Sequence, residues 1–224
     1  MADDLDIGIA LRFLKQLARN NNKPWFDEHR ADYEKAAAQF EHLVAQLITG
    51  IGKVQDLDGV TPKDCIMRIY RDVRFSKDKS PYKTGFGAGI APGGRKSGRL
   101  GFHLHLEPNG ATMAAAGLWE PDPRQLARFR DAIVKDAGPF HKITDAADFK
   151  RHFVEVMGDA LKTAPKGYPA DHPEVALLRQ KQICVFEEFG DDVVASREFP
   201  GLLVSSFRVM KPFVDYLNRV AMGA

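Results

Sequence analysis

The stretch Thr84–Leu118, TGFGAGIAPGGRKSGRLGFHLHLEPNGATMAAAGL, decides the fold. Three segments in it have the length and the residue pattern of strands: Thr84–Ala91, Leu100–Glu107 and Thr112–Leu118. Their connectors contain the turn-forming runs Pro92–Gly94 and Pro108–Gly110. Connections this short join only antiparallel neighbours, so the stretch predicts a β-meander.

Helical patterns lie on both sides of this meander. Before it, apolar residues at helical spacing predict helices over Asp6–Ala18 and over Pro24–Gly50, followed by a strand over Cys65–Tyr70. After it, we predict helices near residues 126–134, 146–156 and 172–179, a strand over Gln182–Phe186, and a long helix ending near Val220. Strands grouped in the middle and helices at the ends predict an α+β fold, in which a central antiparallel β-meander is packed by N-terminal and C-terminal helices. We expect one domain spanning residues 1–224.

The composition is that of an ordinary globular protein, since 44% of the 224 residues are apolar. No window approaches the ~18 apolar residues of a membrane span, and the acidic start around Asp3 and Asp6 lacks the basic region of a signal peptide. We therefore expect a bacterial cytoplasmic protein with no membrane partner. Cys65 and Cys184 are far apart and surrounded by apolar residues, so we expect both to be core residues. The oligomeric state stays open.

The charge is unevenly distributed along the chain. Residues 68–106 contain nine Lys or Arg and two Asp, a net charge of +7. The rest of the chain must then carry −5, because the total is +2. A local excess of one sign creates a field that attracts the opposite charge, so the segment favours an anionic partner.

The functional segment that this charge indicates is 68–84. Its candidate ligand-binding residues are the cations and the two tyrosines: Arg68, Tyr70, Arg71, Arg74, Lys77, Lys79, Tyr82 and Lys83. Arginine presents a flat fork of donors that matches phosphate and carboxylate oxygens. In the alternative interpretation, Asp72 and Asp78 pair with these cations and leave a solvated loop. Two carboxylates cannot neutralise six cations, so we predict a site for a small anion.

Neither a phosphate-binding loop nor a metal site is predicted. The glycines of Gly89–Ser97 lead into a strand rather than a helix, so this segment is interpreted as a hairpin tip. His103, His105 and Glu107 share one strand face, but a fourth ligand is lacking. We expect no metal and no cofactor. If that face lies beside Arg68 and Tyr70, His105 is a candidate proton carrier, as are Asp72 and Asp78.

Two other classes of function stay open. A nucleic-acid-binding module would use the same basic surface, with Trp25 and Tyr82 as stacking groups. A protein-interaction domain would dock the basic loop on an acidic partner. Catalysis is undecided, because the chain has no G-x-S-x-G nucleophile motif and no cysteine in an evidently basic setting.

Several motifs together resemble the family named domain of unknown function 2461, a family of conserved hypothetical proteins. They are Asn20–Asn22 with Trp25 and Phe26, Arg68–Thr84, Gly117 with Pro121, and Ala164–Tyr168 with His172 and Pro173. The resemblance covers nearly the whole chain and implies a single α+β domain. It brings no established activity. The family more usually has aromatic residues near His103, a difference that weakens the metal interpretation further.

Overall fold

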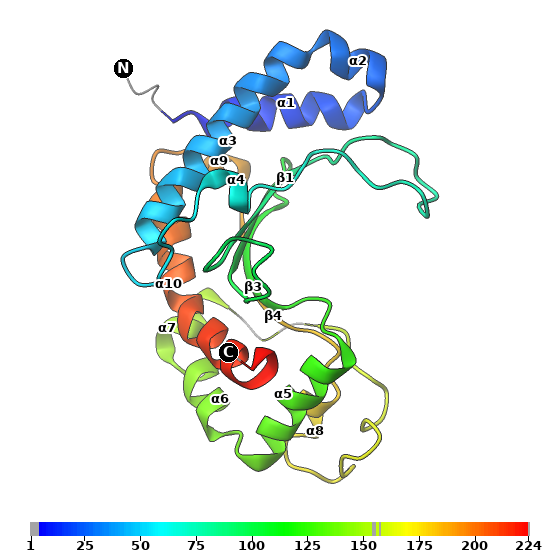
Figure 1. Cartoon of the computed structure of the whole chain (residues 1–224), viewed down its shortest axis with the longest axis vertical. Coiled ribbons are helices and arrows are strands. Elements are labelled where there is room, and N and C mark those ends of the chain that lie inside the picture. Colours follow the sequence, from blue (N-terminus) through cyan, green and yellow to red (C-terminus); the bar gives the residue numbers. More distant parts are fainter. Residues whose placement is uncertain (1–4, 154–155, 157, 224) are drawn as a thin grey trace. The chain divides into compact units, whose positions relative to one another are not determined.

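The predicted meander is present in the computed structural model, which describes residues 5–153, 156 and 158–223. Strands β1 (Phe86–Ile90), β2 (Phe102–Leu106) and β3 (Thr112–Leu118) are consecutive neighbours in a four-stranded antiparallel sheet, and β4 (Ile183–Phe189) lies beside β3 (Figure 1). The bounds of β3 agree with the prediction. β1 and β2 are each shorter than predicted, and β4 extends three residues beyond Phe186. The α+β class is therefore confirmed.

The contacts of the chain group into two compact units, both of which contain residues of the sheet. Unit 1 consists of residues 1–97, 103–114 and 188–205, and unit 2 of residues 98–102, 115–187 and 206–224. Among the described residues, no helix has the length and apolar character needed to cross a membrane.

The helices of unit 1 follow the predicted apolar stripes. They are α1 (Ile7–Arg19), α2 (Lys23–Glu28), α3 (Arg30–Ile51), α4 (Pro62–Cys65) and α9 (Asp191–Val194). The α1 residues Ile7, Leu11, Leu14 and Leu17 are all buried, as their spacing requires. The prediction of one helix over Pro24–Gly50 is wrong at His29, where α2 ends. The backbone of His29 leaves the helical region, with φ −102° and ψ 25°, and its imidazole Nδ1 lies 2.9 Å from the Trp25 carbonyl oxygen. The helix therefore ends there, and α3 starts anew.

The strand predicted over Cys65–Tyr70 is wrong as a regular element. Cys65 ends α4, and the extended chain after it makes two isolated antiparallel bridges, from Ile66 to Ala88 and from Tyr70 to Tyr82. Tyr70 is four positions after Ile66, whereas their bridge partners, Tyr82 and Ala88, are six positions apart. The two bridges are therefore out of register, and a continuous ladder does not form.

Unit 2 contains the C-terminal helices: α5 (Pro123–Lys135), α6 (Gly138–Thr144), α7 (Ala147–His152), α8 (Val175–Leu178), the greater part of α10 (Phe199–Leu217), and the π-helical turn η1 (Asn218–Met222). α6 was not predicted. The predicted helix over 146–156 is shorter, and Val154 and Glu155 in it lie outside the described residues. The predicted helix over 172–179 begins three residues later, at Val175.

Close packing in unit 2 explains one residue of the family motifs. A Cβ atom added to Gly117 on β3 would lie 2.1 Å from the Ile183 carbonyl oxygen of β4, and the φ of Gly117 is +130°. Only glycine fits both requirements. Cys65 and Cys184 are buried and unpaired, as predicted, and burial raises the pKa of their thiols to about 11 and about 12.

Candidate functional site

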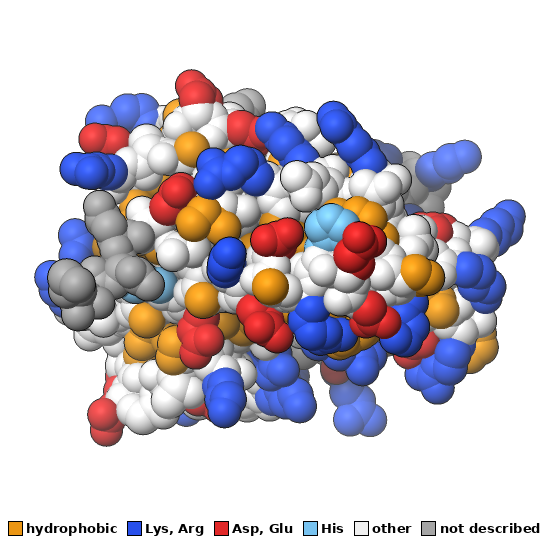
Figure 2. All heavy atoms as spheres, turned by 90° about the horizontal axis from the view of Figure 1, so that it is seen from above, with side chains coloured by type: hydrophobic (Ala, Val, Ile, Leu, Met, Phe, Trp, Pro, Cys, Tyr) orange, Lys and Arg blue, Asp and Glu red, His pale blue; other side chains and the backbone are white. Residues whose placement is uncertain are grey.

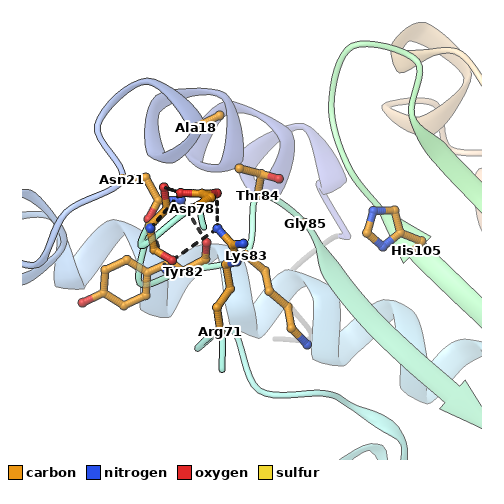
Figure 3. A pocket seen from close by; sticks show the side chains of 10 residues that line it. Ala18, Asn21, Arg71, Asp78, Tyr82, Lys83, Thr84, Gly85 and His105 are labelled. Atoms are coloured by element: carbon orange, nitrogen blue, oxygen red, sulfur yellow. Dashed lines mark hydrogen bonds and ion pairs between the residues drawn. The ribbon is translucent and has the colours of Figure 1, made fainter. Parts of the chain in front are cut away.

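A pocket of about 530 Å³ lies within unit 1 (Figure 3). Three parts of the chain converge on it. Ala18 comes from the last turn of α1, Asn21 from the turn between α1 and α2, and His105 from β2. The remaining lining residues come from the basic segment and its continuation toward β1: Arg71, Asp78, Ser80, Tyr82, Lys83, Thr84 and Gly85.

The wall of the pocket is fixed by Asn21. Its side-chain amide donates to the Tyr82 carbonyl at 2.9 Å and accepts from the Tyr82 N–H at 3.1 Å. The flanking asparagines end and begin helices: Asn20 follows the last residue of α1, and the Asn22 side chain caps α2 by accepting from the Trp25 N–H. Three consecutive asparagines thus close one helix, hold the basic segment and start the next helix.

Arg71 enters the pocket but is already engaged. Its guanidinium pairs with Asp78 and donates to the Ser80 carbonyl at 3.3 Å (Figure 3). Asp78 also accepts from the Ser80 hydroxyl at 2.6 Å and from the Ser80 N–H at 2.9 Å. The Ser80 hydroxyl, the Ser80 N–H and the Arg71 guanidinium together hold the pKa of Asp78 well below its usual range. This network shapes the loop and occupies part of the donor capacity of Arg71.

The outer part of the basic loop pairs with itself. Arg74 forms a salt bridge with Asp72 at 2.7 Å, and the Lys79 ammonium donates to the Val73 carbonyl at 2.9 Å. Phe75, between these groups, is 96% exposed. Figure 1 shows the loop running out from β1 and returning, and in Figure 2 Lys and Arg side chains are grouped at the edge of the molecule on that same side. For this outer part, the alternative interpretation of paired, solvated charges is the better one.

Lys83 differs from the other cations of the segment. It is half-buried, and within the described part of the chain its ammonium has no hydrogen bond and no ion pair. Burial, and then the nearby charge of Arg68, lower its pKa. Arg68 is exposed and likewise lacks an ion pair among the described residues. Two neighbouring cations without a carboxylate between them repel each other, and an anion would relieve that repulsion.

His105 lines the pocket on the side away from Arg71 and is held in a fixed orientation (Figure 3). Its Nε2 lies 2.6 Å from Glu107 Oε2, and the Thr84 hydroxyl donates to Glu107 Oε1 at 2.5 Å. Burial raises the pKa of Glu107, but the hydrogen bonds from Thr84 and His105 outweigh burial and leave this pKa below its usual value. Glu107 is thus a carboxylate that accepts from the His105 Nε2–H, and this bond assigns Nδ1 as the acceptor nitrogen of the ring.

Glycines make the space that His105 needs. A Cβ atom on Gly85 would lie 3.0 Å from the His105 ring and 2.9 Å from the Leu106 carbonyl oxygen. Gly85 precedes β1, and two residues later, within β1, Gly87 lies beside Met67 and the ring of His103. Burial first, and then the charges of His105 and Lys83, lower the pKa of His103 to about 4, so its ring is neutral at pH 7. Within the described residues, no three His, Cys, Asp or Glu side chains are grouped as metal ligands.

The structure brings together only part of the predicted site. Arg71, Tyr82, Lys83 and the candidate proton carriers Asp78 and His105 line the pocket. Tyr82 contributes mainly its backbone, because its ring is 3% exposed and stacks on Phe26 at 4.0 Å. Of the other predicted residues, Arg68, Tyr70, Arg74, Lys77 and Lys79 are outside the lining. Thr84, Gly85 and the role of Asn21 were not among the predicted site residues. The signal for Gly85 in the sequence is the alternation of glycines in GFGAG, opposite the histidines of β2.

Comparison with known proteins places the chain in a family. Residues 9–216 match the family model described as "Conserved hypothetical protein (DUF2461)". This agrees with the resemblance carried by the sequence motifs. No curated protein matches the chain, and no solved structure does.

Proposed function

Because the chain belongs to the DUF2461 family of conserved hypothetical proteins, whose description assigns no activity, we propose its function from the pocket alone. The pocket binds a small anion that carries a phosphate or a carboxylate, and Lys83 is its main anchor. The observation that supports this proposal is the half-buried Lys83 ammonium without a partner among the described residues. Burying an unpaired charge is costly, and a bound anion supplies the missing partner.

The expected affinity follows from the cations that remain available. A charge-assisted hydrogen bond contributes about 1.5 to 3 kcal/mol, so Lys83 with one arginine gives roughly 3 to 6 kcal/mol. A dissociation constant of 1 mM corresponds to about 4 kcal/mol, and one of 1 µM to about 8 kcal/mol. The cations alone therefore support binding in the millimolar to submillimolar range, and ligands should be screened at millimolar concentration.

The test is a thermal-shift screen of inorganic phosphate, sugar phosphates, nucleotides and carboxylic acids. A ligand that binds only the folded state raises the melting temperature by mass action. We expect at least one anion to stabilise the wild type, and Lys83→Ala and Arg68→Ala to respond less. Lys77→Ala is the matched control, because Lys77 is an exposed lysine of the same loop outside the pocket. If no anion stabilises the wild type, or if Lys83→Ala responds as the wild type does, the proposal fails.

A second candidate function is binding of single-stranded nucleic acid by the outer loop. Its support is the 96% exposed ring of Phe75, over which the Arg74 guanidinium lies 5.8 Å from the ring centroid. An exposed ring flanked by cations can stack on a base while the cations contact phosphates. Tyr82 is unsuited to stacking because it is buried, and Trp25 is engaged by the His29 ring at 4.1 Å. Titration of a labelled single-stranded oligonucleotide with wild type and Phe75→Ala tests this function; equal affinities would exclude the stacking role.

A further inference from the structure

The pocket combines three groups that do more than hold an anion. The Lys83 amino group is a nucleophile when it loses its proton, and it has no competing hydrogen-bond partner among the described residues. His105 lines the same pocket and is oriented by Glu107 at 2.6 Å. Arg71 lines it too, and among the described residues its Nη2 donates only to the Ser76 hydroxyl, at 3.4 Å, so this nitrogen retains donors for a carboxylate.

We propose that Lys83 forms an imine with the carbonyl carbon of a 2-oxo acid. This inference rests on the proposed anion pocket and deepens it, because it names the ligand class. A 2-oxo acid has a carbonyl directly beside its carboxylate, so one short molecule presents an electrophile and an anion together. The carboxylate lies toward Arg71 and the carbonyl toward Lys83.

The groups around Lys83 favour the amine form that the reaction needs. Burial and the neighbouring charge of Arg68 both disfavour the ammonium, and both lower the pKa of Lys83. Desolvation and a nearby cation are the two ways in which proteins activate a lysine for attack on carbonyl compounds. The same setting explains why a cation is kept partly buried without a carboxylate, which a purely structural lysine does not require.

The chemistry balances without a further reactant. The Lys83 amine attacks the carbonyl carbon, the C=O π pair moves to oxygen, and His105 Nδ1 accepts a proton from the attacking nitrogen. The oxygen takes up two protons, the one held by His105 and the one that the Lys83 ammonium gave up to solvent before the attack, and leaves as water when the C–N double bond forms. Overall, one ammonium and one carbonyl give one protonated imine and one water, with no oxidation or reduction. His105 returns the proton that it accepted, so it ends as it began.

The test is trapping of the imine with borohydride. Wild type is incubated with pyruvate, reduced, digested and mapped by mass spectrometry. Reduction fixes the adduct as a secondary amine, so we expect the peptide that contains Lys83 to gain the mass of pyruvic acid less one oxygen atom. L-Lactate is the control ligand, since it has the carboxylate but no carbonyl and should bind without trapping.

Two variants separate the chemistry from simple binding. Lys83→Arg keeps the positive charge but has no amine that can form this imine, so it should still be stabilised by lactate and should lose the adduct. Lys77→Arg, the matched change at an exposed position, should keep the adduct on Lys83.

The outcomes distinguish this inference from the proposal on which it rests. If pyruvate and lactate both raise the melting temperature but no adduct forms on Lys83, the imine is excluded and the anion pocket stands. If neither they nor the other anions of the screen raise it, the pocket itself is wrong. Labelling of Lys77 and other exposed lysines as strongly as Lys83 also overturns the inference, because it shows ordinary surface reactivity.

Discussion

At the scale of single residues, the site depends on how polar side chains are engaged. Asn21 satisfies both backbone groups of Tyr82, and in unit 2 Asn218 does the same for Leu100, with bonds of 2.9 and 3.0 Å. Each amide bonds to the N–H and C=O of one residue as a neighbouring strand would. A side chain that bonds to a backbone N–H and C=O together specifies position more tightly than either bond alone.

We therefore expect Asn21→Ala to destabilise the protein by about 1 to 3 kcal/mol, because the Tyr82 N–H and C=O lose their partner. The measurement is the free energy of unfolding in urea. Asn20→Ala is the control: Asn20 donates from its side chain to one exposed carbonyl, that of Gln16, and should cost less. If the two variants lose the same free energy of unfolding, the two bonds to Tyr82 contribute no more than the single bond to Gln16.

Asp78 competes with a ligand for Arg71. Asp78→Asn keeps one acceptor oxygen, to which both the Ser80 N–H and the Ser80 hydroxyl can donate, but removes the negative charge from the pocket. We therefore expect anion affinity to rise about tenfold, or ~1.4 kcal/mol. Calorimetric titration with an anion found in the screen measures this change. Asp58→Asn, at an exposed carboxylate outside the pocket, should leave the affinity unchanged. A lower affinity for Asp78→Asn would mean that Asp78 organises the site more than it competes.

His103 should make the free energy of unfolding depend on pH. Its folded-state pKa of about 4 is below the ordinary 6.5, so between these values the unfolded chain binds a proton that the folded chain does not. The free energy of unfolding should therefore fall as the pH falls from 6.5 to 4, by up to about 3 kcal/mol from this residue. Unfolding of wild type and His103→Gln at several pH values tests this. If the free energies of unfolding of the two proteins change in parallel between pH 4 and 6.5, the pKa of His103 is not lowered in the folded state.

At the scale of elements, β1 packs closely because one of its faces lacks side chains. In Gly85→Ala the new methyl group meets both the His105 ring and the Leu106 carbonyl oxygen, at 3.0 and 2.9 Å. We expect a loss of about 1 to 3 kcal/mol in the free energy of unfolding and weaker anion binding, because His105 must move. Gly201→Ala is the matched control. Apart from its chain neighbours and the backbone of its own helix, no described atom lies within 4 Å of the new methyl group. Because position 201 is in the helix α10, the change should stabilise by up to about 1 kcal/mol.

The elements that the sequence predicts well are those governed by local rules. The three strands of the meander follow from short turn-rich connectors, and α1 from its four buried aliphatic residues. The errors occur where a contact distant in the chain, or a side-chain bond, decides the outcome. The helix breaks at His29, where the backbone leaves the helical region and the imidazole lies against the Trp25 carbonyl oxygen. Residues 66–70 lose strand regularity through their out-of-register pairing with 82–88.

In the candidate site, too, the sequence predicts what local rules govern and not what depends on tertiary contacts. A count of charges located the segment, but it could not rank the cations within it. The structure separates Lys83, which lacks a partner among the described residues, from Arg74 and Lys79, which are bonded within their own loop. That distinction depends on which side chains the fold buries, and alternation alone does not predict burial in an irregular loop. Likewise, the sequence placed His105 and Glu107 on one face. That His105 lines a pocket with Lys83, and that Glu107 accepts from Thr84, required the tertiary structure.

At the scale of the whole molecule, the positive charge of residues 68–106 is set against a negative remainder, and salt dependence shows which part of it binds. Contact of single-stranded nucleic acid with Arg74, Lys77 and Lys79 would release about three counterions, so log affinity should fall against log salt with a slope of about −2. An anion held by Lys83 in a pocket is screened less, because half-buried charges are shielded from ions. We expect a small carboxylic acid or phosphate compound to show the shallower slope.

Phe75→Ala makes the comparison specific to the outer loop. Because the ring is 96% exposed and outside the pocket, its removal should leave both stability and small-anion affinity unchanged. Loss of one base stack should weaken oligonucleotide binding by about 1 to 3 kcal/mol, if the loop binds nucleic acid. Fluorescence titrations of both ligands from 50 to 200 mM salt, with wild type and Phe75→Ala, measure the two effects together. A steep slope for the small anion, or its loss in Phe75→Ala, would mean that the outer loop and the pocket bind as one surface, and Lys83 would then lose its place as the main anchor.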